Sequence, residues 1–83
     1  MPVISKSEAR KKGIPKKTLQ TIEIPKTFTL KQSRDWLKKN NYAWHYHRLT
    51  TNFRRFMQTP DIDNAKYYSK KLNDGIVLVF QEY

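Results

Sequence analysis

The feature that most restricts the fold of this chain is a tight-turn signal beside an apolar run near its C-terminus. Asn73-Asp74-Gly75 is typical of a hairpin turn, and it directly precedes Ile76 to Phe80, in which every residue is apolar. Such a run is typical of a strand that is buried in a sheet or in a subunit interface. Residues 65–72 suit either a helix or a strand, but the adjacent turn favours a strand. We therefore predict an antiparallel strand pair here.

A half-buried strand and a helix are indicated closer to the N-terminus. Thr18 to Ile24 is rich in β-branched residues and alternates apolar with polar ones, and Pro25 ends this strand. Thr29 and Gln32 have the spacing of a capping box, which predicts a helix that runs to about Asn40. One side of this helix is apolar and the opposite side is basic, so we expect it to pack on a sheet.

Two more strands follow the helix. Tyr42 to Leu49 alternates again, a short loop follows, and Phe53 to Gln58 carries aromatic and basic residues in turn. The fold class that results is α+β, a single small domain in which one helix packs on an antiparallel sheet of four to five strands. The opposite sheet face is then left exposed.

The N-terminal segment differs from the rest of the chain in composition. The first 17 residues carry six Lys or Arg against one Glu, and their apolar residues are too few for a core. Pro2, Gly13 and Pro15 are expected to break any regular element, and like charges keep such a segment solvated. The chain, at 83 residues, has room for one domain. We predict a basic flexible arm over residues 1–17 and an α+β domain over residues 18–83.

The charge balance points to a polyanionic partner. The chain has 17 Lys and Arg against 7 Asp and Glu, a formal net charge of +10. Clustered lysines and arginines neutralise phosphates and release counterions, which gives affinity without sequence reading. We therefore expect a nucleic acid as the partner, double-stranded DNA first of all.

Several function classes are excluded on composition. The chain has no cysteine, which removes disulfides and Cys-based zinc sites and suits a reducing compartment. No apolar run approaches the roughly 20 residues of a membrane span, and the N-terminus lacks the apolar stretch of a signal peptide, so we expect no membrane partner and no secretion. Phosphate-binding loops and nucleophile motifs are absent from the sequence, and the pairs His45/His47 and Asp61/Asp63 hold too few metal ligands. We predict no enzyme activity, metal, cofactor or small-molecule substrate.

The residues expected to contact phosphates are the cations of the arm, the helix and the 42–58 hairpin. They are Lys6, Arg10, Lys11, Lys12, Lys16, Lys17, Lys31, Arg34, Lys38, Lys39, Arg48, Arg54 and Arg55. Alternative roles stay open at this point. The arm also suits a solubilising tail or a nuclear-import signal, the helix cations suit a solvated surface, and the arginines suit packing over aromatic rings.

The exposed sheet face is expected to bury itself against a second copy of the chain. A homodimer would bury apolar surface and double the positive charge. The candidate interface residues are Trp44, Tyr46, Phe53, Ile76, Leu78 and Phe80.

Three segments together resemble a known type of viral protein. Trp36-Leu37-Lys38-Lys39 with Tyr42, then Asn52-Phe53-Arg54-Arg55-Phe56, and finally Gly75 to Val79 resemble a small uncharacterised α+β domain of large DNA viruses and tailed phages. The resemblance covers about residues 18–80. The whole chain, with its basic arm, resembles the small abundant basic virion proteins of marseillevirus-type giant viruses. This resemblance implies a structural, genome-associated role without catalysis, in the virion interior or in the host cytoplasm or nucleus during infection.

The leading hypothesis is therefore an architectural or virion protein that binds DNA through phosphates and aids genome compaction or packaging. One alternative is a protein-interaction or minor structural component of a capsid or assembly, whose positive charge meets acidic surfaces of its partners. An exposed edge at Ile76 to Phe80 that adds to a partner's sheet would favour this alternative. Another is binding of single-stranded RNA by an aromatic sheet face that includes Trp44 and Tyr46.

Overall fold

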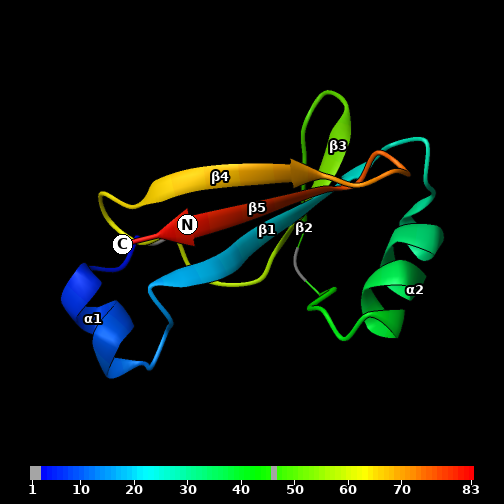
Figure 1. Cartoon of the computed structure of the whole chain (residues 1–83). Coiled ribbons are helices and arrows are strands. Elements are labelled where there is room, and N and C mark those ends of the chain that lie inside the picture. The colour runs from blue at the N-terminus through cyan, green and yellow to red at the C-terminus, as the bar shows by residue number, and fades with distance from the viewer. Residues whose placement is uncertain (1–2, 46) are drawn as a thin grey trace.

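The structure is a computed structural model that describes residues 3–45 and 47–83. Within these ranges it has two helices and five strands. They are α1 (Lys6–Lys11), β1 (Lys17–Pro25), α2 (Leu30–Lys39), β2 (His47–Leu49), β3 (Phe53–Met57), β4 (Lys66–Lys71) and β5 (Val77–Glu82). The strands form an antiparallel sheet in the order β2-β3-β1-β5-β4 (Figure 1). The predicted α+β class is confirmed, and residues 66–71 form a strand rather than a helix.

Local sequence signals account for the start of α2 and for the last turn of the chain. Thr29 and Gln32 form the expected capping box, in which each side chain accepts a hydrogen bond from the other residue's backbone N–H, at 3.1 and 2.8 Å. The turn between β4 and β5 places Gly75 at φ 89°, a backbone conformation that residues with a Cβ rarely adopt. Both predictions are confirmed.

The expected strand over residues 42–49 is wrong in its first half, because β2 begins only at His47. The backbone of Ala43 is held by a side chain instead of a neighbouring strand. Its N–H donates to Oε1 of Gln58 at 2.8 Å, and its carbonyl accepts from Nε2 of the same amide at 2.9 Å. Tyr42 stacks on Trp36, with ring centroids 5.9 Å apart, so it stays close to α2.

The register assigns residues to two faces of the sheet, because residues directly opposite each other in antiparallel strands point to the same side. Ile22 lies opposite both Phe56 and Leu78. These side chains share a core with Leu37 of α2, so we call this side of the sheet the α2 face. The main hydrophobic core lies between α2 and this face. This confirms the prediction that the helix after Thr29 packs on the sheet.

The link from β3 to β4 crosses β1 and β5 on the opposite side, which we call the crossover face. Gln81 is fully buried beneath this link. Its Nε2 donates to the carbonyl of Pro60 at 2.8 Å and to Oγ1 of Thr59 at 3.0 Å, and its Oε1 accepts from the N–H of Ile62 at 3.1 Å. The crossing is therefore held by side-chain hydrogen bonds.

The expectation that no regular element forms within residues 1–17 is wrong, because α1 occupies Lys6–Lys11. The N–H of Ile4 donates to the carbonyl of Asp61 at 2.9 Å, and the N–H of Asp63 donates to the carbonyl of Ile4 at 2.8 Å. Ile4, Ala9 and Ile62 form a second small core. The prediction failed because it counted apolar residues within the segment alone, while Ile62 comes from the crossing.

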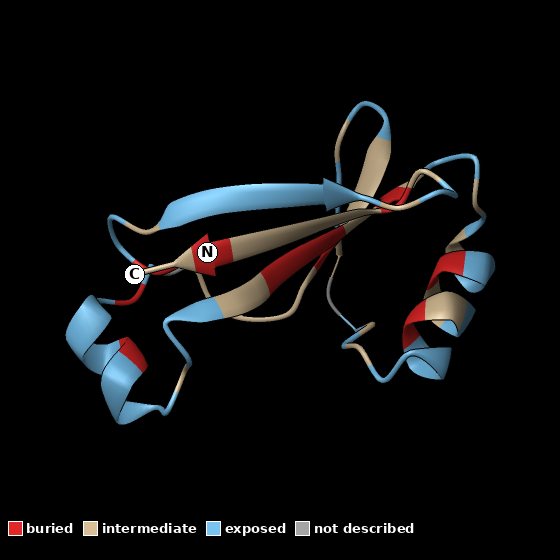
Figure 2. Ribbon diagram, viewed as in Figure 1, coloured by how far each residue is buried: buried red, intermediate tan, exposed pale blue. Residues whose placement is uncertain are grey.

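The two helices lie at opposite ends of the sheet (Figure 1), and the longest dimension of the molecule is 38 Å. Since α2 packs on one face and α1 packs on the link that crosses the other, each face is covered at one end. Figure 2 shows that β4 is exposed along its whole length. The remaining half of each face is where a partner has access.

Candidate nucleic-acid interface

The cations of the N-terminal segment lie together at one end of the molecule. Lys6, Arg10 and Lys11 are on α1, Lys12 is its C-cap, and Lys16 directly precedes β1. All of them are exposed, and within the part of the chain that the structure describes none belongs to an ion pair. The anchoring through Ile4 and Ile62 gives this positive charge a fixed place beside the sheet.

Four cations lie on α2 at the other end: Lys31, Arg34, Lys38 and Lys39. Lys31 pairs with Asp35 one turn later, with Nζ and Oδ2 3.7 Å apart. The ammonium group of Lys38 lies 4.0 Å from the ring centroid of Trp44, a cation–π contact that leaves its charge intact. Lys39 is exposed. The helix thus adds positive charge, although Lys31 is partly neutralised.

The three arginines of the β2–β3 hairpin do not form one cluster. Arg54 points to the α2 face, where its Nη1 donates to the carbonyl of Phe28 at 2.6 Å. Arg55 points to the crossover face, where its Nε lies 3.2 Å from Oε2 of Glu23. Arg48 lies opposite Arg55 on β2 and is exposed. Arg54 and Arg55 therefore have partners within the chain, and Arg48 is the member of the three that faces solvent.

The sequence prediction missed the cations of β4. This edge strand carries Lys66, Lys70 and Lys71 together with Tyr67 and Tyr68, and every residue in it is exposed. A pair of tyrosines flanked by lysines would have been a usable signal, but the sequence did not decide between a helix and a strand for this segment. Lysines on an edge strand also discourage pairing with strands of other chains.

The expected dimer residues are not brought together on one surface. Ile76 is 0% exposed and belongs to the main core, so its proposed place in an interface is wrong. Leu78 and Trp44 also pack against that core. Phe80 shares the α2 face with Leu78, whereas Phe53 lies on the crossover face opposite Pro25. Tyr46 lies outside the described residues.

Within the run Ile76 to Phe80, the side chains that reach the crossover face are those of Val77 and Val79, which are half-buried. In a run where every residue is apolar, the alternation that separates the two faces is lost. The prediction therefore chose Ile76, Leu78 and Phe80, which point the other way.

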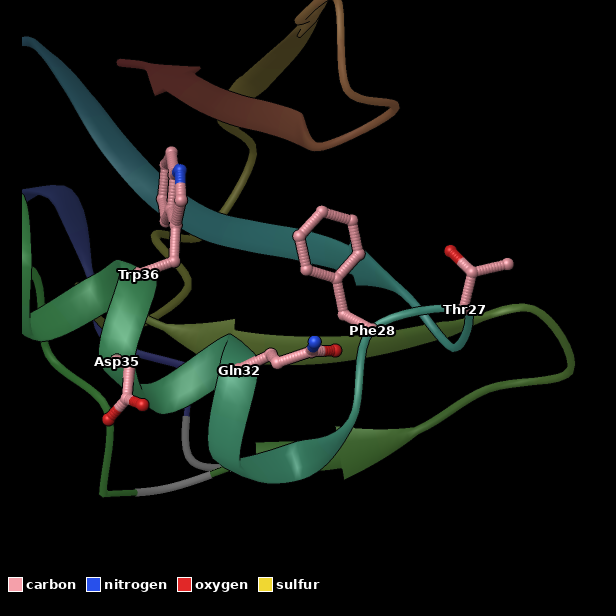
Figure 3. A pocket seen from close by; sticks show the side chains of 5 residues that line it. All are labelled: Thr27, Phe28, Gln32, Asp35 and Trp36. Atoms are coloured by element: carbon pink, nitrogen blue, oxygen red, sulfur yellow. The ribbon is translucent and has the colours of Figure 1, made fainter.

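A shallow hollow of ≈ 450 Å³ lies beside α2 and is lined by Thr27, Phe28, Gln32, Asp35 and Trp36 (Figure 3). The two rings are directed towards the sheet, and both side chains pack partly against the main core. No Lys or Arg is among the residues that line it. The hollow therefore offers no cation of its own to a phosphate, although Asp35 pairs with Lys31 at its border.

Other kinds of site find little support in residues 3–45 and 47–83. No group of three or more His, Cys, Asp or Glu is placed to hold a metal ion there. Neither described helix is long and apolar enough to cross a membrane.

Partial burial raises the pKa of Tyr67 above its usual 10.0. The hydrogen bond to Asp61 and the negative charge of that carboxylate raise it further, while the charge of Arg55 lowers it.

Comparisons with models of protein families, with curated proteins and with solved structures found no match to this chain.

Proposed function

We propose that this protein binds nucleic acid, duplex DNA first of all, through its phosphates and with little sequence preference. The observation that carries the proposal is uncompensated positive charge. The chain has 17 Lys and Arg against 7 Asp and Glu. Across the described residues, two ion pairs are found, Lys31–Asp35 and Arg55–Glu23. Most of the positive charge therefore faces solvent and is available to a polyanion.

The spread of this charge sets the size of the expected site. The cations of α1 and α2 lie at opposite ends of a molecule 38 Å long. At 3.4 Å per base pair this length corresponds to about 11 base pairs of B-form DNA. Lysines dominate both ends, and they position a protein on phosphates rather than reading base edges. These features support backbone binding over one helical turn.

The proposal includes a homodimer, but its interface lies on the crossover face instead of around Ile76, Leu78 and Phe80. The open half of the crossover face carries the half-buried side chains of Phe53, Val77 and Val79. A symmetric contact there would leave both charged ends exposed and link two DNA-binding surfaces, which raises avidity and bridges DNA segments. Together with the resemblance to basic virion proteins, this supports a role in genome compaction or packaging, in the virion or in the infected cell.

The capsid-component alternative loses its specific support. An exposed edge at Ile76 to Phe80 would have favoured it, but β5 lies between β1 and β4 in the sheet. The edge strand β4 is rich in lysine, which disfavours strand addition.

The experiment that tests the proposal measures binding to a random-sequence duplex of about 12 base pairs between about 50 and 200 mM salt. For about six neutralised phosphates, log K should fall with log salt at a slope near −5. The variant Lys6→Gln/Arg10→Gln/Lys11→Gln should make the slope shallower by about 2.7, since each lost phosphate contact removes about 0.9. Glutamine keeps the helix propensity of α1.

The matched control is Ser7→Gln, which changes an exposed residue of the same helix and leaves the net charge unchanged. Its slope should equal that of the unmodified protein. Absence of binding at the low-salt end would reject the proposal, and so would a slope that the α1 variant leaves unchanged.

A further inference from the structure

An apolar row crosses the half of the α2 face that is remote from α2. Tyr68 of β4 lies opposite Phe80 of β5, and Phe80 lies opposite Leu19 of β1. The side chain of Tyr68 is 45% exposed, and the other two are half-buried. The three side chains are therefore neighbours on one face of three adjacent strands, and Tyr68 lies on β4, the open edge of the sheet.

Lysines border this row on the same face. Lys66 and Lys70 flank Tyr68 at a spacing of two residues, which places each about 6.7 Å along β4 from it. Lys17, at the start of β1, has its Nζ 5.4 Å from the centroid of the Tyr68 ring. Glu82 lies between Lys17 and Lys66 in the register, so three lysines surround the row against one carboxylate.

We propose that this row is a binding site for unpaired nucleotides, in which a base stacks on Tyr68 beside Phe80 while the lysines hold the flanking phosphates. A base offers a flat face to an aromatic ring only when it is not stacked within a duplex, and such stacking tolerates any base. Lys17 lies loosely over the ring and is exposed, so its ammonium group can move to a phosphate as the base takes its place. The inference rests on the proposed function and adds a preference for unpaired strands.

The neighbouring tyrosine provides the contrast. Tyr67 points to the crossover face, lies opposite Gln81, and donates its hydroxyl proton to Oδ1 of Asp61 at 3.0 Å. A carboxylate at that position repels phosphate. Tyr68 and Tyr67 thus lie on the same strand with similar exposure, 45% and 50%. They differ in that the hydroxyl of Tyr67 is bound to a carboxylate, whereas lysines flank Tyr68. The aromatic site expected around Trp44 is less suitable, because Trp44 packs on the main core under Lys38.

The test compares Tyr68→Leu with Tyr67→Leu on four probes: a dT12 strand, an rU12 strand, a 12-unit abasic strand with the same phosphates, and a 12-base-pair duplex. Tyr68→Leu should weaken binding of dT12 about 10-fold, because stacking on one aromatic ring contributes about 1–3 kcal/mol per base. Its binding of the abasic strand and of the duplex should stay within about twofold. Tyr67→Leu should change none of the four, and dT12 should quench the tyrosine fluorescence of the unmodified protein more than the abasic strand does.

A second variant tests the phosphate part of the site. Glu82→Gln removes the carboxylate between two lysines and should tighten binding of every probe by about two- to fivefold. Equal losses on dT12 and the abasic strand in Tyr68→Leu would overturn the inference, as would unchanged dT12 binding. Failure of the proposed function looks different, because the unmodified protein would then bind neither the duplex nor the abasic strand. The ratio of dT12 to rU12 affinity tells whether DNA or RNA is preferred.

Discussion

Replacing Gln81 by methionine should loosen the crossing between β3 and β4 and, with it, the N-terminal segment. Methionine is similar to glutamine in length and volume, so it fills the same fully buried site without its polar atoms. The N–H of Ile62 and the carbonyl of Pro60 lose their partners. The hydroxyl of Thr59 keeps its bond to the carbonyl of Leu19 at 3.1 Å. Two backbone groups are therefore left unsatisfied.

The size of the effect follows from those two groups. A buried polar group without a partner costs about 1–3 kcal/mol, so Gln81→Met should destabilise the crossing by about 3 kcal/mol. Since the N–H groups of Ile4 and Asp63 form the bonds that tie the N-terminal segment to the crossing, their hydrogen exchange should accelerate by about 100-fold. Urea unfolding gives the global change, and amide exchange followed by NMR gives the local one.

The control removes a similar amount of stability at the opposite end of the sheet. Ile76→Ala leaves a cavity beside α2 and should cost about 2–5 kcal/mol globally. It should leave the local opening that exposes the Ile4 and Asp63 amides unchanged. The reasoning is refuted if both variants accelerate these two amides equally, or if Gln81→Met has the stability of the unmodified protein.

Three further predictions concern single residues. Gly75→Ala should cost more stability in urea than Gly13→Ala, because both glycines have a positive φ but only at Gly75 would the new Cβ lie 3.3 Å from a Pro25 side-chain carbon. For alanine the left-handed conformation alone costs about 1–2 kcal/mol. Equal losses of stability in the two variants would show that the contact with Pro25 has no effect. Thr29→Ala should destabilise the fold by about 1 kcal/mol through loss of the capping box, and an unchanged urea midpoint would contradict this. The raised pKa of Tyr67 contributes stability that is complete below the usual value of 10.0 and is lost as pH rises through the folded-state pKa. Tyr67→Phe should therefore lose less stability between about pH 9 and about pH 11 than the unmodified protein does, as measured by urea unfolding.

Local sequence signals predicted those elements whose cause lies within a few residues. The capping box at Thr29 and the turn at Gly75 depend on neighbouring groups only. Alternation predicts the burial of Ile22 and Ile24 in β1, but it does not predict that Gln20 and Thr21 are buried too, where the register shifts. The fold class follows from these elements. The strand over residues 42–49 was overextended because alternation of aromatic residues also occurs where Tyr42 packs back on α2.

The parts that could not be predicted depend on contacts between distant segments. The helix α1 is fixed by Ile62, about 50 residues away in the chain, and no count within the segment finds that contact. Gln81 looks like an ordinary polar residue near a strand end until the crossing covers it. The candidate site shows the same limit, because Lys17 and Tyr68 meet only through the pairing of β1, β5 and β4.

The net charge of +10 links stability and binding with opposite dependence on salt. Like charges on a small domain repel one another, and added salt screens this repulsion, so the free energy of unfolding should rise between about 50 and 500 mM salt. Binding of DNA should weaken over the same range, because the release of the same counterions into a more concentrated salt solution gains less entropy. A duplex that binds the folded chain should therefore raise its melting temperature at low salt. At high salt the duplex should no longer raise the melting temperature, because it no longer binds, while the salt itself stabilises the chain. A melting temperature that falls with salt in the absence of DNA would show that internal attraction, rather than repulsion, dominates the charges of the folded chain. The cations would then be engaged within the chain, and the observation that carries the proposed function would no longer hold.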